Sequence, residues 1–141
     1  MQVYRYGLGI IATTLLASCS GPEAEPELYP DSLFENPPAS DTGAIAELRG
    51  RWVSEENTDR ELEISGHEFV RFEKAVETSR GPAVFVKDCS TGSADPDGEA
   101  FVVKESGEKT CYIMSSVTED KLVFIHGKRG RMFRFTRRTE E

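Results

Sequence analysis

The sequence predicts an all-β fold: a small antiparallel β-barrel of about eight strands, preceded by a short helical turn. Between residues 53 and 135, short runs rich in β-branched and aromatic residues follow one another at close spacing. Glycine, proline and acidic residues interrupt these runs, as is typical of hairpin turns. A chain of 141 residues, 38% hydrophobic and 30% charged, holds one such domain and excludes a polytopic membrane protein.

Eight or nine runs are expected as strands, and one segment is expected as a helix. The strand runs are residues 53–54, 62–64, 69–72, 75–78, 83–86, 100–103, 111–114, 122–125 and 132–135. Arg80-Gly81-Pro82 and Asp95-Pro96-Asp97-Gly98 are expected to be turns between strands. Residues 42–48 have a helical pattern of one or two turns, with a cap near Asp41 or Thr42.

The interior of a barrel with eight strands is either filled by side chains or holds one small ligand. Short strands with much aromatic volume favour a mostly packed core over a deep ligand cup. The large apolar side chains to be placed are Trp52, Leu62, Ile64, Phe69, Phe72, Phe85, Phe101, Tyr112, Ile113, Met114, Leu122, Phe124, Phe133 and Phe135.

The N-terminal residues have the pattern of an export signal. Arg5 precedes an apolar stretch at residues 7–16, which is too short to span a bilayer as a helix. Leu16-Ala17-Ser18-Cys19 follows and resembles the lipobox of bacterial lipoproteins; the alternative is an ordinary secretory signal with an incidental cysteine. The resemblance implies a signal peptide at residues 1–18 and acylation of Cys19, which anchors the chain in a membrane.

Ser20, which follows that cysteine, is not aspartate. By resemblance to the enterobacterial sorting rule, this favours the outer membrane, with the protein facing the periplasm.

Residues 19–43 are expected to be a disordered tether. From residue 20 to 43 the chain has five of its seven prolines, six acidic residues and no lysine or arginine. An acidic docking motif for a basic partner is the alternative to a solvated spacer. Tyr29, Leu33 and Phe34 are exceptions, which either pack on the domain or form a short recognition site.

The domain at residues 44–141 begins with Gly50-Arg51-Trp52, which holds the only tryptophan. This triplet resembles the Gly-x-Trp start of the lipocalin superfamily, and the closest pattern is that of the small lipocalin-like domains of bacterial lipoproteins. In that family an arginine near the end of the last strand packs across the tryptophan and closes one end of the barrel. The resemblance implies Gly50, Trp52, Arg131 and Arg134 as closure residues, with Arg137 as a further candidate.

Cys89 and Cys111 are expected to form a disulfide, because paired cysteines are usually oxidised in an exported protein. A metal or redox pair is the alternative, although neither histidine nor a third thiolate lies near them in the sequence. The carboxylates at residues 95–99 are too few for a calcium loop and are interpreted as a turn. His67 and His126 are interpreted as surface histidines at turns, without a nucleophile motif beside them.

Basic residues gather near the end of the domain and form either a solvated edge or a site for anionic lipid, lipopolysaccharide or an acidic protein. They are Lys128, Arg129, Arg131, Arg134, Arg137 and Arg138. The formal net charge of −8 opposes nucleic-acid binding.

The sequence thus predicts an envelope lipoprotein, a monomer, with a non-enzymatic barrel that binds a small apolar or anionic molecule. The alternative is a protein-interaction or inhibitor module that acts through surface loops. Neither a metal nor a cofactor is expected.

Overall fold

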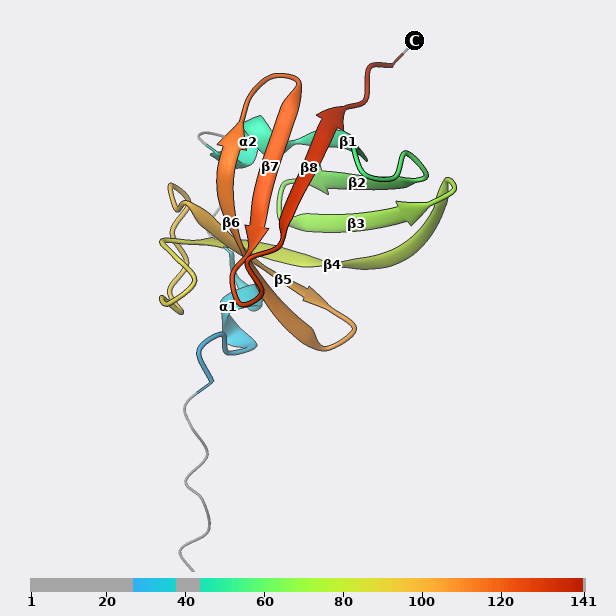
Figure 1. Ribbon diagram of the computed structural model, residues 1–141. Helices are drawn as coiled ribbons and strands as arrows, with labels where there is room; N and C mark the ends of the chain where they lie inside the picture. The colour runs from blue at the N-terminus through green and yellow to red at the C-terminus, as the bar shows by residue number, and fades with distance from the viewer. Residues whose placement is uncertain (1–26, 38–43, 141) are drawn as a thin grey trace, which may run out of the picture.

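The computed structural model describes residues 27–37 and 44–140 and shows a closed antiparallel barrel (Figure 1). Each strand pairs with the next one along the chain, and the last strand pairs back with the first. The strands are β1 (Gly50–Ser54), β2 (Arg60–Ser65), β3 (Glu68–Glu73), β4 (Val76–Val86), β5 (Ala100–Glu105), β6 (Glu108–Val117), β7 (Lys121–His126) and β8 (Met132–Arg137). The predicted all-β barrel with eight strands is confirmed.

One expected turn is instead part of a strand. The runs 75–78 and 83–86 belong to the single strand β4, which continues through Gly81-Pro82. Gly81 lies so close to β5 that a Cβ atom there would be 1.8 Å from the Lys104 carbonyl oxygen. This glycine lets two strands approach closely, and it therefore does not mark a chain reversal.

The barrel interior is filled by side chains, as the sequence predicts. Alternation along the strands sends Trp52, Phe101 and Phe124 into one continuous core, where each is at most 1% exposed. Two expected core residues lie elsewhere. Ile113 is 39% exposed, because its neighbour Tyr112 takes the interior position, and the Arg51 guanidinium covers the ring of Phe72, 4.1 Å from its centroid.

The expected helical turn before the barrel is present as α2 (Ala44–Leu48). Its expected caps, Asp41 and Thr42, lie outside the described residues, as do the lipobox, Cys19 and Ser20.

Residues 27–37, which we call the strap, pack against the outside of the barrel. The strap contains the short helix α1 (Ser32–Glu35). Leu33 is buried in a cluster with Val84, Val86 and Val102, on the outer face of β4 and β5. Tyr29 donates a hydrogen bond from its hydroxyl to the Cys89 carbonyl oxygen. The expectation of an unpacked tether is therefore wrong for the strap, because Leu33 is buried against the barrel and Tyr29 and Phe34 are partly buried there.

Ion pairs hold the strap to the hairpin of β5 and β6. Asp31 contacts Lys104 at 2.8 Å and Lys109 at 3.0 Å, and Glu27 also pairs with Lys109. Hydrogen bonds from the two lysines lower the pKa of Asp31 to about 2. Two acidic residues of the predicted spacer, Glu27 and Asp31, are thus specific partners of two lysines on the barrel.

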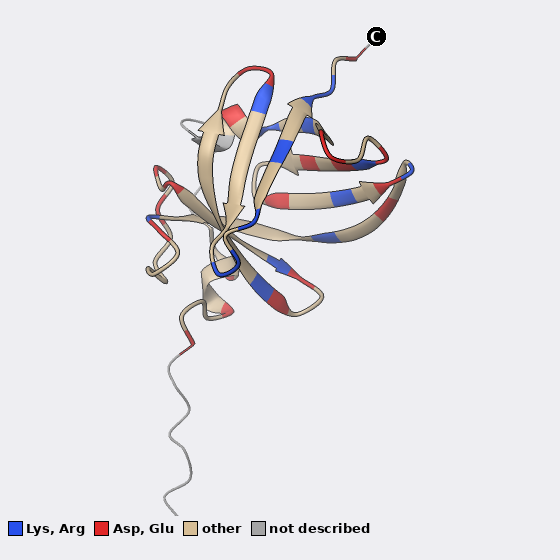
Figure 2. Cartoon of the chain, viewed as in Figure 1, with Lys and Arg blue, Asp and Glu red and all other residues tan. Residues whose placement is uncertain are grey.

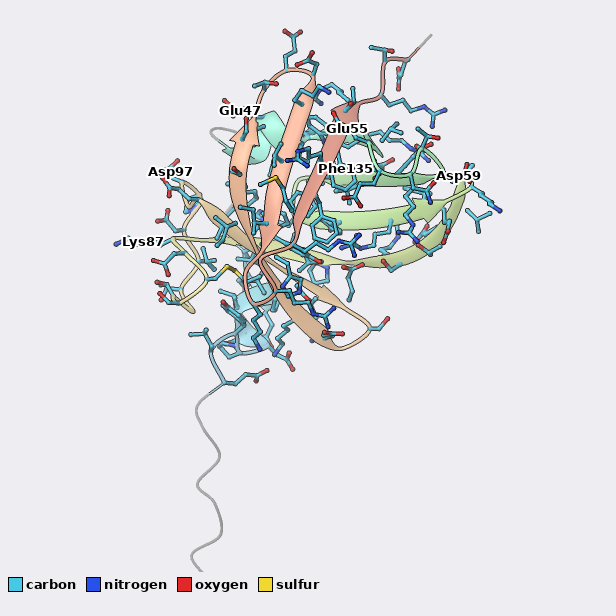
Figure 3. The ribbon with its side chains drawn as sticks, viewed as in Figure 1. Glu47, Glu55, Asp59, Lys87, Asp97 and Phe135 are labelled. Carbon is cyan, nitrogen blue, oxygen red and sulfur yellow. A yellow bond between two sulfur atoms is a disulfide. The ribbon has the colours of Figure 1, made fainter. Side chains whose placement is uncertain are left out.

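The disulfide is formed beside the strap, between Cys89 in the loop after β4 and Cys111 on β6 (Figure 3). The S–S distance is 2.07 Å, and 22 residues separate the two cysteines. Gly127 lies against the bond, where a Cβ atom would be 2.9 Å from the Cys89 sulfur. Closing a loop of this length contributes about 3 kcal/mol to stability.

Candidate functional site

One end of the barrel, which we call the closed end, is sealed around Trp52. The ring is fully buried, and its Nε1 donates a hydrogen bond to the Leu48 carbonyl oxygen of α2 at 2.9 Å. The Arg137 guanidinium lies over the ring, 4.1 Å from its centroid. Nη1 and Nη2 of Arg137 donate to the carbonyl oxygens of Arg49 (2.6 Å) and Glu47 (2.8 Å), so this one side chain ties β8 to the end of α2.

Gly50 is needed for that arrangement. Its φ of +132° is unfavourable for an L side chain, and a Cβ atom there would be 2.5 Å from Nη1 of Arg137. Gly50, Trp52 and Arg137 therefore form one structural unit.

The prediction that Arg131 and Arg134 close the barrel is wrong. Arg131 lies at the other end of β8, over the Phe133 ring and 3.2 Å from Glu56. Arg134 is exposed on the outer face of β8. Side chains on β8 point alternately into and out of the barrel. Of the three arginines, only Arg137 both points inward and is paired with Trp52 across β1 and β8.

The opposite end, which we call the mouth, is open. It has a pocket of about 250 Å³ among the ends of β1, β2, β3 and β8. Leu62, Phe133 and Phe135 supply its apolar lining. Its charged residues are Glu56, Arg60, Glu61, Arg71, Glu73 and Arg131.

A polar cluster inside the mouth is centred on Arg71. Its Nε donates to Glu105 at 3.0 Å and its Nη2 donates to the Tyr112 hydroxyl at 3.0 Å, while Ser79 donates to the same Glu105. Burial, the dominant cause, raises the pKa of Tyr112, so this phenol stays protonated and keeps a proton to donate. The cluster places a guanidinium and a phenol O–H above the aromatic core.

Tyr112 lines a second hollow of about 410 Å³, on the side of the mouth nearer β6 and β7, and Arg71 lines the first. Phe133 borders both hollows, and the second hollow is also lined by Glu105, Glu108, His126 and Arg129. The mouth thus carries carboxylates as well as arginines, and it is not simply a basic site.

Sequence reasoning missed the residues of this polar cluster. Arg71 lies two positions after the buried Phe69, and the strand period therefore directs both side chains inward. That spacing was available in the sequence. Its partners Glu105 and Tyr112 come from other strands, and no local pattern indicates that they meet.

The six basic residues expected as one cluster are spread along β8 from one end to the other (Figure 2). Lys128 and Arg129 lie in the turn between β7 and β8, while Arg137 and Arg138 lie at the closed end. Arg138 pairs with Glu61 at 2.8 Å. A single six-residue anion patch is therefore not formed.

The remaining candidates have local structural roles. His126 accepts hydrogen bonds at Nδ1 from the backbone N–H groups of Lys128 and Arg129, and His67 lies 3.3 Å from the Ala83 carbonyl oxygen. Asp95 accepts from the backbone N–H of Asp97, as in a turn. Within residues 27–37 and 44–140, His, Cys, Asp and Glu side chains do not form a group of three that could bind a metal ion.

The fold and the two ends define a small up-and-down β-barrel with a packed interior and one open mouth. Comparison with protein-family models, curated proteins and solved structures finds no significant match to this chain. None of the helices in the described part of the chain is long and apolar enough to cross a membrane.

Proposed function

We propose that this protein is a membrane-anchored envelope lipoprotein whose lipocalin-like barrel binds, without catalysis, a small molecule with an apolar body and an anionic end. The observation that carries the proposal is the Arg71 guanidinium, held by Glu105 and Tyr112, in a pocket at the mouth with an apolar lining. The packed interior supports binding at the mouth in place of a deep cup.

The pocket limits the size of the ligand. Its volume of about 250 Å³ lies below the usual range for drug-sized ligands, about 300–1,000 Å³. One water molecule occupies about 30 Å³ in the liquid. If each heavy atom of a ligand takes the same volume, the pocket holds about eight heavy atoms. A short carboxylate fits this limit, and a long acyl chain does not.

The donors limit the chemistry of the ligand. Nε and Nη2 of Arg71 are engaged by Glu105 and Tyr112, and no described residue accepts from its Nη1. A carboxylate in the pocket would accept from that Nη1, while Tyr112 and Glu105 hold the guanidinium in place. Glu105 would oppose the anion, so we expect a Kd in the millimolar range for an unoptimised ligand.

An NMR titration with hexanoate, which has eight heavy atoms, tests this site. We expect shifts at Phe133 and Phe135, which line the pocket, and binding at least tenfold weaker in Arg71→Gln. Arg80→Gln is the matched control, because Arg80 pairs with Glu77 on an exposed part of β4. Equal binding of hexanoate and hexylamine, or binding that Arg71→Gln leaves unchanged in a folded protein, would overturn the proposal.

The anchor is tested separately. Cys19→Ser should abolish incorporation of a labelled fatty acid and should release the protein from membranes, because acyl chains on Cys19 are the proposed attachment. A variant that still sediments with outer membranes after a high-salt wash would contradict the anchor and would leave the mouth site intact as a proposal.

A second candidate function, a protein-interaction or inhibitor module, is favoured by the tip of the β3–β4 hairpin. Lys74 and Ala75 have positive φ values of 50° and 64°, and Val76 beside them is 65% exposed. Backbone strain of this kind clusters at functional sites such as ligand clamps and switch regions. A photo-crosslinker at Val76 should then give one discrete protein adduct in cells, and a crosslinker at the exposed Arg134 should not.

A further inference from the structure

The strap shortens the link between the proposed anchor and the barrel. If residues 19–43 were all free, 25 residues would separate the barrel from the membrane. With the strap docked from Glu27 onward, the free link from Cys19 is eight residue steps, which span at most about 29 Å when fully extended. Glu27 therefore stays within that distance of the lipid surface.

The basic turn between β7 and β8 lies beside Glu27. Glu27, Leu28, Lys128 and Arg129 all line one groove of about 640 Å³ on the outside of the barrel. Figure 2 shows this blue turn near the start of the described chain, whereas the closed end points the other way. Attachment through residue 19 thus brings this side of the barrel toward the membrane.

Some of the charged residues that line this groove form ion pairs and others do not. Lys109 is occupied by Glu27 and Asp31 of the strap. Lys128 and Arg129 are exposed, and neither forms an ion pair with a described residue. Glu108 is the acidic side chain on the β6 side of the groove, and Glu27 is the one on the strap. Because Lys109 neutralises Glu27, the charge at the outer edge of the groove is set mainly by Lys128 and Arg129 and is positive.

We propose that the turn at residues 127–130, with Lys128 and Arg129, contacts the phosphate groups of an anionic lipid surface and fixes the orientation of the barrel on the membrane. The inference rests on the proposed lipid anchor. Each cation near an anionic surface strengthens the contact by about fivefold, and the anchor supplies the high local concentration that so small a patch needs. The mouth hollow that contains Arg129 then also faces the lipid side.

Amine footprinting of the full acylated chain tests the orientation. The protein is reconstituted in vesicles of phosphatidylcholine alone or with a quarter of phosphatidylglycerol, and then treated with an amine-acetylating reagent. We expect Lys128 to be modified several-fold more slowly on the anionic vesicles, and Lys74, at the far hairpin tip, to be modified equally on both. Arg129→Gln should reduce the protection of Lys128.

The outcomes separate the two hypotheses. Protein that floats with the vesicles while Lys128 and Lys74 react alike would overturn the orientation and leave the anchor standing. Equal protection of Lys128 on both vesicle types would overturn the requirement for an anionic surface, because phosphatidylcholine carries a phosphate but no net charge. Protein that does not float with either vesicle would refute the anchor, and the orientation would fail with it.

Discussion

The two ends of the barrel are held by different forces. At the closed end, a fully buried Trp52, a cation–π contact and hydrogen bonds from Arg137 to backbone carbonyls fix β1, β8 and α2 together. At the mouth, ion pairs such as Arg71–Glu105 and half-buried rings such as Phe133 line an open pocket. The buried contacts lie at one end and the solvent access at the other, an arrangement that suits the proposed binding at the mouth.

The largest effect should come from removing the tryptophan. Trp52→Ala should reduce the free energy of unfolding by about 3–5 kcal/mol, because it leaves a cavity in the closed end. Phe133→Ala, at the half-buried mouth, should cost less, about 2 kcal/mol. Urea denaturation measures both, and equal losses would remove the contrast between the ends.

A smaller effect is expected for the arginine over the ring. Arg137→Ala should cost about 1–2 kcal/mol through the lost cation–π contact and packing. Arg134→Ala is the matched control on the same strand and should stay within about 0.5 kcal/mol of the parent. Melting temperatures of the two variants measure this difference. Equal melting temperatures would count against Arg137 as the closure residue.

At the mouth, one substitution should stabilise the protein. Ala75 has a φ of 64° in a two-residue turn between the paired residues Glu73 and Val76, a position that favours glycine. Ala75→Gly should therefore raise stability by about 0.5–1 kcal/mol. Ala83→Gly, within a strand, should lower it. A loss of stability in Ala75→Gly by thermal unfolding would contradict the turn strain.

The smallest effect concerns pH and the strap on the mouth-side hairpin. The pKa of Asp31 is about 2, below its usual 3.8. The stabilisation that ionised Asp31 gives to the docked strap is therefore complete above about pH 4 and is lost as the pH falls toward 2. The hydrogen bond with Glu27 raises the pKa of Lys109. The stabilisation that charged Lys109 gives to the docked strap therefore persists to about pH 10.5 and is lost above that. NMR signals of the Leu33 methyl groups should report release of the strap in acid. Asp31→Asn should shift that release, and a pH-independent signal would contradict it.

The sequence predicted the fold because barrel strands leave local signals: a period of two, turn residues and a Gly-x-Trp start. It also predicted the disulfide partners, since Cys89 and Cys111 are the only pair within the domain. Membrane attachment and ligand binding remain predictions.

The errors came from contacts between distant residues. The choice of Arg137 over Arg131 and Arg134 depends on the register of β8 against β1, across about 85 residues of sequence. The docking of the strap depends on Lys104 and Lys109, which meet Asp31 only after β5 and β6 have paired. A segment rich in proline and acidic residues is expected to be disordered when it is isolated. Its composition alone does not reveal that the folded barrel has apolar and basic residues to which it can bind.

The pairing of β8 with β1 also has a consequence for biogenesis. Trp52 meets Arg137 across the seam, so a nascent chain cannot close the barrel until its final strand has been synthesised. Until then β1 has an unpaired edge and Trp52 lacks its cover, which are features that chaperones recognise. If the chain is exported as we propose, late folding keeps it competent for passage through a narrow translocon, and the strand that completes the barrel would set the moment at which that competence ends.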